Sequence, residues 1–169
     1  MTTRILVAGI GNVFLGDDGF GSEVIRHAAG PLAQRRFPGV AVEVVDYGIR
    51  GMHLAYDLLE RWDALVLVDA VPDRGHPGRL HVFEADHDTL APTTGLESHS
   101  MDPAAVFGTL TALGGTAPTT FVIGCEVANV DEGMGLSEPV AAAVPDAVAA
   151  LDGVLSDLTA GATPLARKG

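Results

Sequence analysis

The fold of this chain is decided by Ile5-Leu6-Val7-Ala8-Gly9-Ile10-Gly11-Asn12-Val13-Phe14-Leu15-Gly16-Asp17-Asp18-Gly19-Phe20-Gly21, an apolar run that ends in glycines and leads to two adjacent acids. The apolar part predicts a first buried parallel strand, which turns sharply at Gly9 and Gly11 into a helix. Ligands of open α/β sheets bind beyond the carboxyl ends of the strands, so the loop with Asp17 and Asp18 is expected at a ligand site. Two carboxylates in that loop favour a cation.

A nucleotide-binding loop is the first alternative for a glycine-rich turn after a first strand. The dinucleotide fingerprint requires a third glycine where this chain has Phe14, and its ribose acid lies about 20 residues on, whereas the first acid at the end of a second strand is Asp46. No Gly-Lys-Ser/Thr follows, and two acids would repel a pyrophosphate. A second alternative stays open at this point, in which Asp17 caps the first helix and Asp18 is solvated.

Two further strands are predicted, and each ends in an acid. The β-branched, apolar run 40–45 is followed by Asp46, and the run 64–68 is followed by Asp69. Helical stretches at about 20–36, disturbed by Gly30-Pro31, and 52–61 connect these strands. Right-handed crossovers make the strands parallel, so the Asp18 loop, Asp46 and Asp69 reach one edge of the sheet. Two carboxylates about 4 Å apart repel by roughly 4 kcal/mol, which a proton, a basic group or a metal must offset.

The remaining elements complete an α/β fold. The run 79–84 follows the third strand too closely for a crossover helix, which predicts an antiparallel or edge strand. The run 119–125 is the fifth strand, and a last helix begins at Ser137 and is kinked by Pro145. We therefore expect a single-domain, three-layer sandwich over residues 1–158, with a mostly parallel five-stranded sheet. Residues 159–169 are expected to form a loose C-terminal tail.

Histidine is the ligand that would complete a metal site beside these acids. His99 precedes Ser100-Met101-Asp102-Pro103, a cap and proline pattern that opens a helix, and a helix start favours the unprotonated imidazole. A solvated or capping role is the competing interpretation of such a residue. That interpretation is kept for the other five histidines, which are His27, His53, His76, His81 and His87. Two carboxylates and one imidazole suit a borderline divalent ion such as nickel or zinc.

Together, these motifs resemble one known family along nearly the whole chain. The motifs are Gly9-x-Gly11-Asn12, the run Gly16-Asp17-Asp18-Gly19-Phe20-Gly21, Val68-Asp69-Ala70, Ser98-His99-Ser100-Met101-Asp102-Pro103 and Gly135-Leu136-Ser137. They are similar to those of the maturation endopeptidases of nickel-iron hydrogenases. The resemblance implies removal of a short C-terminal extension from the hydrogenase large-subunit precursor after nickel has been inserted.

The resemblance also implies roles for particular residues. Asp18, Asp69 and His99 match the metal-contacting acid, Asp and His of the family, which makes them the candidate catalytic and metal residues. Nickel is expected to arrive with the substrate, and zinc or another divalent ion is the alternative occupant of the isolated site. The family loop Gly-Thr-x-Gly, implicated in substrate handling, here reads Gly48-Ile49-Arg50-Gly51, so a threonine hydroxyl is missing. Asp46 is expected to orient this loop or a ligand.

A non-catalytic alternative remains because no site residue is an unambiguous nucleophile. In this alternative the chain is a metal-sensing chaperone or binder of the same precursor. The single cysteine, Cys125, lies in an apolar strand and is expected to be buried and not a nucleophile. Glu126 follows it and is expected either to line the cleft or to be a solvated edge residue. No Gly-x-Ser-x-Gly elbow occurs in the chain.

Composition limits the partners and the compartment. The 169 residues carry 22 acidic and 10 Lys and Arg residues, a formal net charge of −12. This charge disfavours nucleic acid and anionic membranes and makes a basic partner surface plausible. A chain with one cysteine cannot form an internal disulfide. The N-terminal apolar run is too short for a signal peptide, and no apolar run has the length of a transmembrane helix. We therefore expect a cytoplasmic protein without membrane insertion.

Overall fold

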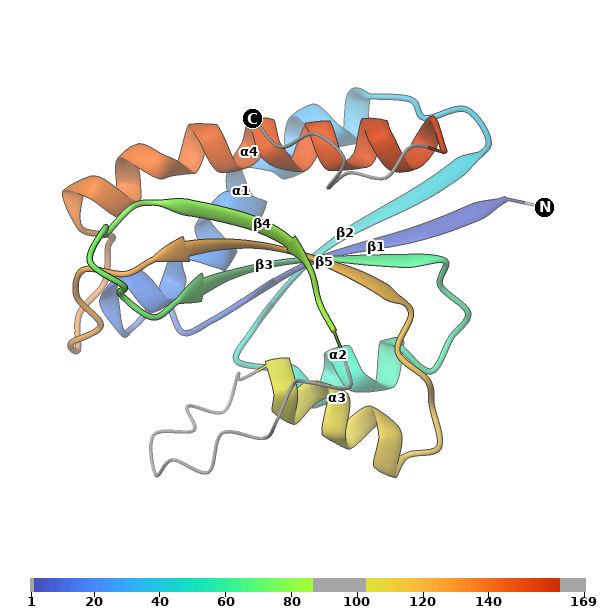
Figure 1. Cartoon of the computed structure of the whole chain (residues 1–169), viewed down its shortest axis with the longest axis horizontal. Helices are drawn as coiled ribbons and strands as arrows, with labels where there is room; N and C mark the ends of the chain where they lie inside the picture. The colour runs from blue at the N-terminus through green and yellow to red at the C-terminus, as the bar shows by residue number, and fades with distance from the viewer. Residues whose placement is uncertain (1, 87–102, 162–169) are drawn as a thin grey trace.

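The computed structural model describes residues 2–86 and 103–161 and contains one five-stranded sheet (Figure 1). The strands are β1 (Thr3–Ile10), β2 (Val40–Gly48), β3 (Ala64–Val71), β4 (Leu80–Glu84) and β5 (Thr119–Glu126). Their spatial order is β2-β1-β3-β5-β4. All neighbours are parallel except β4, which pairs antiparallel with the edge of β5. The predicted mixed sheet, including its one antiparallel strand, is confirmed.

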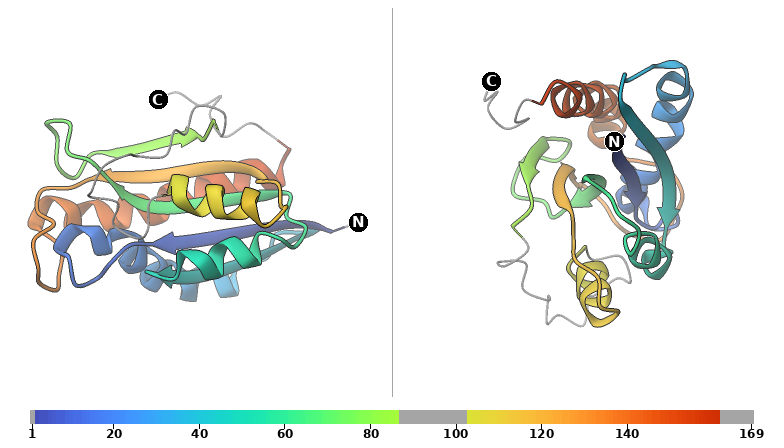
Figure 2. Two further views of the ribbon diagram at one scale, coloured as in Figure 1. Left: turned by 90° about the horizontal axis from the view of Figure 1, so that it is seen from below. Right: turned by 90° about the vertical axis from the view of Figure 1, so that its right-hand side faces the viewer.

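Helices cover both faces of the sheet, which gives the three predicted layers. In Figures 1 and 2, α1 (Phe20–Gln34) and α4 (Glu138–Thr159) lie on one face, and α2 (Gly51–Asp57) and α3 (Pro103–Ala112) lie on the other. A short 3-10 helix, η1 (Gly16–Gly19), precedes α1. The helices of each face also contact each other, α1 with α4 and α2 with α3.

Two hydrophobic cores result from the alternation of side chains along the central strands. On β1, Ile5 and Val7 point to the α1/α4 face, whereas Leu6, Ala8 and Ile10 point to the α2/α3 face. The strands β3 and β5 alternate in the same way. Because both faces are buried, the central strands are continuously apolar in sequence, as a strand covered on both sides requires.

Two helix predictions differ from the observed elements in their bounds, and the expected kink at Pro145 stays a prediction. The helix α1 runs from Phe20 to Gln34 and includes Pro31, which supplies no backbone N–H to the helix. The second helix is shorter than predicted and ends at Asp57, and its following residues form turns. The last helix starts as predicted and includes Pro145 within one continuous element. Thr159 is still helical, and the rest of the predicted tail lies mainly outside the described residues.

The helix α4 is long and apolar enough, by length and composition, to cross a membrane. Here it is a core helix of the domain. Its buried side chains, which include Val140, Val144, Leu151 and Leu155, join the core on the α1/α4 face of the sheet. Its apolar character is explained by this packing.

Candidate active site

The loop with Asp18 folds back onto the end of β1 because of glycines at close contacts. Gly11 has a φ of 133°, and a Cβ at this position would lie 2.0 Å from the Asp18 carbonyl oxygen. The backbone N–H of Asn12 donates to Asp18 Oδ2 at 2.8 Å. One oxygen of the half-buried Asp18 carboxylate is therefore fixed by a backbone N–H of its own loop.

The start of α1 is pressed against the ends of β1 and β3. A Cβ on Gly21 would lie 2.3 Å from the Val68 carbonyl oxygen and 2.4 Å from that of Ile10. The short helix η1, which contains Asp18, also lies against β3. These contacts place the Asp18 loop beside the end of the strand that carries Asp69.

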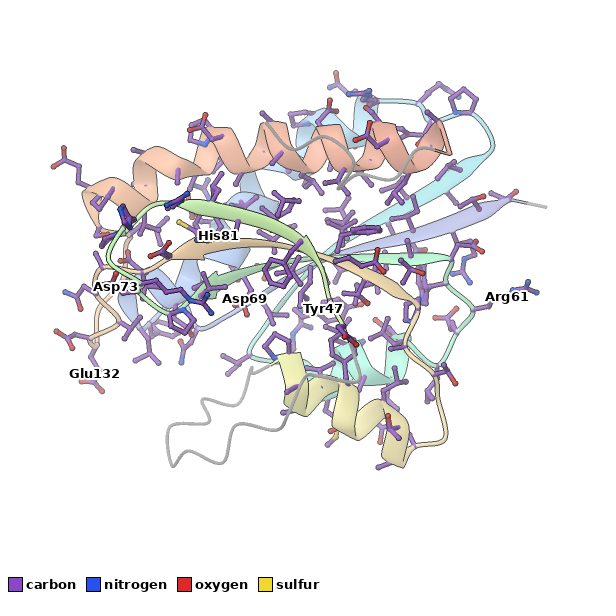
Figure 3. The ribbon with its side chains drawn as sticks, in the orientation of Figure 1. Tyr47, Arg61, Asp69, Asp73, His81 and Glu132 are labelled. Atoms are coloured by element: carbon purple, nitrogen blue, oxygen red, sulfur yellow. The ribbon has the colours of Figure 1, made fainter. Side chains whose placement is uncertain are left out.

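Asp69 is buried near the carboxyl end of β3, at the end of the sheet where the parallel strands terminate (Figure 3). Its side chain points to the α2/α3 face, in alternation with Leu65 and Leu67 of the core on that face. One carboxylate oxygen, Oδ1, accepts the Ala70 N–H at 2.8 Å. Gly124 is its register neighbour on β5, so no side chain from that position covers Asp69.

Asp46 lies at the same edge as Asp69 but on the opposite face of the sheet. In the register, Gly9 of β1 is flanked by Asp46 and Val68, so Asp46 shares the α1/α4 face with Val68. Its Oδ1 accepts the Ser22 hydroxyl of α1 at 2.7 Å and the Gly48 N–H at 3.0 Å. The three acids share an edge, as the topology requires, but Asp46 faces away from Asp69. Its contacts hold the following loop.

The loop Gly48-Ile49-Arg50-Gly51 is also tied to β1 and to its own backbone. Gly48 has a φ of 55°, and its carbonyl accepts the Gly11 N–H at 3.0 Å. Arg50 Nη2 donates to the Asp46 carbonyl at 2.8 Å, so its guanidinium folds back over the loop. Ile49 remains exposed. The loop therefore presents an apolar side chain where the family pattern has a threonine.

The interpretation of Asp17 as a cap of the first helix is wrong. Neither η1 nor α1 has a side-chain cap, and Asp17 is fully buried. Its Oδ2 accepts the N–H groups of Ala128 and Asn129 and the Ser137 hydroxyl, and its Oδ1 accepts the Ser137 N–H, all at 2.7–2.9 Å. Burial raises the pKa of Asp17, but these hydrogen bonds, led by that of the Ser137 N–H, outweigh it, so the pKa lies below its ordinary value. Asp17 connects its loop to the segment between β5 and α4.

A pair of the buried Glu126 and the partly exposed His81 was not anticipated. Glu126 is 1% exposed, its Oε2 lies 2.7 Å from His81 Nε2, and its Oε1 accepts the backbone N–H groups of Arg74 and His76 at 2.7 and 3.2 Å. The His81 hydrogen bond, followed by that of the Arg74 N–H, lowers the pKa of Glu126 to about 2. The solvated alternative for Glu126 is therefore wrong, and antiparallel pairing of β4 with β5 places the partly exposed His81 beside it.

The sequence signal for this pair is the predicted antiparallel strand 79–84, which places His81 beside β5. His81 is opposite Gly124, and Asp69 is the neighbour of Gly124 on its other side. Asp69 and His81 therefore occupy one row of three strands and point to the same face. Figure 3 shows both side chains in this part of the sheet.

The other histidines and the cysteine behave as expected where they are described. His27 and His53 are on helix surfaces beside Glu23 and Asp57. Cys125 is completely buried, and burial, followed by the charge of Asp17, raises its pKa to about 12. A thiol with this pKa is not an available nucleophile at neutral pH, so the prediction for Cys125 is confirmed.

The third predicted ligand, His99, lies outside the described residues, as does His87. Within residues 2–86 and 103–161, no group of three His, Cys, Asp or Glu side chains is arranged to hold a metal ion. The structure therefore brings the Asp18 loop and Asp69 to one place. The participation of His99 stays a prediction.

Known proteins with similar sequences carry names that refer to hydrogenases or to their maturation. A family model described as "Hydrogenase maturation protease" matches residues 27–153, a range that includes Asp69 and His99 and starts after the Asp18 loop. The "Coenzyme F420 hydrogenase subunit delta" of Methanothermobacter thermautotrophicus is 34% identical over 149 residues, which cover 86% of this chain and 90% of that protein. The "Hydrogenase 2 maturation protease" of Escherichia coli is 27% identical over 86% of each chain.

Solved structures show the same fold. The hydrogenase maturating endopeptidase HybD from E. coli has a TM-score of 0.75 at 24% identity and covers 92% of this chain and 94% of its own. The solution structure of an endopeptidase from E. coli has a TM-score of 0.74 at 28% identity, with 93% and 94% coverage. The matching family model and relatives place the chain in a class of processing peptidases. The chain belongs to the hydrogenase maturation protease family.

Proposed function

We propose that this protein is the endopeptidase that removes the C-terminal extension of a nickel-loaded hydrogenase large-subunit precursor, and that Asp18, Asp69 and His99 contact the metal. One observation carries the proposal. The glycine contacts of Gly11 and Gly21 hold the Asp18 loop against the end of β3, beside the buried Asp69. Family membership supports a peptidase that acts on hydrogenase precursors.

The donor set suits a divalent ion. Carboxylate oxygens from Asp18 and Asp69 and an imidazole nitrogen from His99 are ligands that nickel and zinc accept. Two carboxylates held near each other repel, and a cation offsets this repulsion. The nickel is part of the substrate in this proposal, so three protein ligands are enough to recognise a loaded precursor. A bound divalent ion also polarises a carbonyl oxygen, which is the chemistry that peptide hydrolysis requires.

The loop Gly48-Ile49-Arg50-Gly51 is proposed to handle the substrate. Its backbone is held by Asp46 and by the Gly11 N–H, so its position relative to the Asp18 loop is defined. The exposed Ile49 contacts an apolar part of the precursor in this proposal, in place of a hydroxyl hydrogen bond.

The protein is proposed to act in the cytoplasm on a protein substrate, without nucleic acid. The net charge of −12 supports a partner with basic surface. The alternative of a non-catalytic metal-sensing binder is disfavoured by the family assignment, since relatives carry the name protease. It remains an outcome of the experiment that follows.

The test is a cleavage assay with precursor prepared with and without nickel, in which mass spectrometry detects the released C-terminal peptide. We expect release only from the loaded precursor, and we expect Asp18→Asn to abolish it because the variant keeps its size but loses the charge. Glu43→Gln is the matched control, because Glu43 is an exposed acid on β2. Binding of the loaded precursor without any release by the wild-type protein would support the metal-sensing binder instead.

A further inference from the structure

Two loops at the carboxyl end of the sheet pair with each other as a short ribbon, here called the loop pair and consisting of residues 12–17 and 129–134. Leu15 and Gly133 form a parallel bridge. The Gly16 N–H donates to the Gly133 carbonyl at 2.9 Å, and the Gly133 N–H donates to the Phe14 carbonyl at 2.8 Å. The loop pair is therefore hydrogen-bonded structure, although it lies outside the sheet.

Buried contacts fix the conformation of the loop pair. Gly16 has a φ of 54°, and a Cβ there would lie 2.6 Å from the Asn129 carbonyl oxygen. The Asp17 N–H donates to that same carbonyl at 2.9 Å, and the Asp17 carboxylate accepts the N–H groups of Ala128 and Asn129. The side chains of the loop pair are thus presented by a defined backbone.

The loop pair exposes apolar side chains. Phe14 is 63% exposed and Met134 is 73% exposed, and Val13 and Val130 are also exposed. A large apolar surface on a folded domain indicates an interaction site more often than an isolated exposed residue does. Aromatic residues and methionine are also the types enriched in protein interfaces.

An apolar groove of about 800 Å³ adjoins these side chains between α1 and α4. Val13 and Met134 form its rim on the side of the loop pair, and Leu136, Val144 and Val148 line it further along. The apolar surface therefore continues from the loop pair into a concave region, which is the shape that receives an anchoring side chain or a short segment.

The charges around this surface define the partner. Asp131, Glu132 and Glu138 are exposed on the loop pair and at the start of α4, and Figure 3 shows Glu132 at this end of the molecule. Arg26 and His27, the basic residues that line the groove, are both paired with Glu23, which lines it as well. The rim is acidic, so its complement is an apolar segment with Lys or Arg beside it.

We propose that the loop pair and the adjoining groove are the docking surface for the hydrogenase precursor, which inserts an apolar segment flanked by basic residues. This inference rests on the proposed function. Asp18 lies in η1, and Gly16 and Gly19 at the two ends of η1 line the groove, so the groove reaches the short helix that carries Asp18. Docking there holds the precursor while its scissile region reaches Asp18 and Asp69.

The test compares Phe14→Ser/Met134→Ser with Leu113→Ser, a change at an exposed apolar residue that directly follows α3. We expect the double variant to raise KM for the nickel-loaded precursor about tenfold or more, with kcat retained, and Leu113→Ser to match the wild type. Removing negative charge with Asp131→Asn/Glu132→Gln is expected to weaken the salt dependence of kcat/KM. Circular dichroism and thermal unfolding confirm that each variant is folded.

Binding supplies an independent readout. In the Asp18→Asn background, calorimetry with loaded precursor is expected to show the same loss of affinity for the double variant. An unchanged KM and affinity, or a fall in kcat alone, would overturn the docking proposal. The docking proposal would also be overturned if sedimentation showed the wild type as a dimer and the double variant as a monomer while their KM values were equal. In that case the surface joins two copies of this chain. A wild-type protein that never cleaves loaded precursor contradicts the proposed function itself.

Discussion

Replacing Asp17 by Asn is expected to destabilise the protein by about 4 to 6 kcal/mol, much more than the loss of a surface helix cap. The carboxylate accepts four hydrogen bonds, three on Oδ2 and one on Oδ1. An Asn side chain keeps three of them only by turning its NH₂ group toward the Ser137 N–H, which then lacks an acceptor. That unsatisfied donor costs about 1–3 kcal/mol, and each remaining bond weakens by roughly 1 kcal/mol when its acceptor becomes neutral.

The assay is urea unfolding at pH 7, with the free energy of unfolding compared between Asp17→Asn and the wild type. Glu132→Gln is the matched control, because Glu132 is an exposed acid in the paired loop and its replacement is expected to stay within about 0.5 kcal/mol of the wild type. The pKa of Asp17 is lower in the folded than in the unfolded protein. The contribution of Asp17 to the free energy of unfolding is therefore fully present above its pKa in the unfolded chain, and it declines as the pH falls toward its pKa in the folded protein. A loss below about 1 kcal/mol at pH 7 would refute the argument that these hydrogen bonds hold the two loops together.

Three further results are expected. His99→Ala should weaken nickel or zinc binding in calorimetry without a change in circular dichroism. Metal binding by the wild type should decline as the pH drops, because the ligands must be deprotonated. An unchanged affinity of the His99→Ala variant would remove His99 from the site. Cys125→Ala should retain precursor processing. The thiol of the wild type should resist alkylation at pH 8, because its pKa is about 12. A Cys125→Ala variant that is folded but inactive would reopen a thiol mechanism. Glu126→Gln should lower the thermal midpoint at pH 7. Because the pKa of Glu126 in the folded protein is about 2, the difference in midpoint between the variant and the wild type should shrink as the pH falls from the ordinary glutamate range toward 2. A difference that persists at pH 2 would contradict the role of the charge.

The sheet was predictable because its strands carry their signals locally. Strands buried on both faces must be apolar and β-branched, and a connection too short for a helix requires the antiparallel β4. The shared edge of Asp18, Asp46 and Asp69 follows from the crossover rule alone. The face of Asp46 does not, because it depends on the register that sets Asp46 opposite Gly9.

The polar contacts that hold the site were not predictable from local patterns. Asp17 and Ser137 are 120 residues apart in the sequence, and Glu126 and His81 are 45 residues apart. A lone acid after a glycine or at a strand end looks the same whether its partner is water or a distant backbone N–H. Only the assembled fold shows from which donors each carboxylate accepts hydrogen bonds. Burial of a carboxylate without such partners would be energetically costly.

The link between Asp17 and the segment that precedes α4 also orders events during biosynthesis. The ribosome releases the Asp18 loop early, but the backbone groups that fix this loop belong to residues 128–137 and emerge after every strand of the sheet. A nascent chain that stops before them has all five strands but lacks the hydrogen-bond donors that Asp17 requires in its buried position. The loop that carries Asp17 and Asp18 is therefore completed only with the last part of the chain.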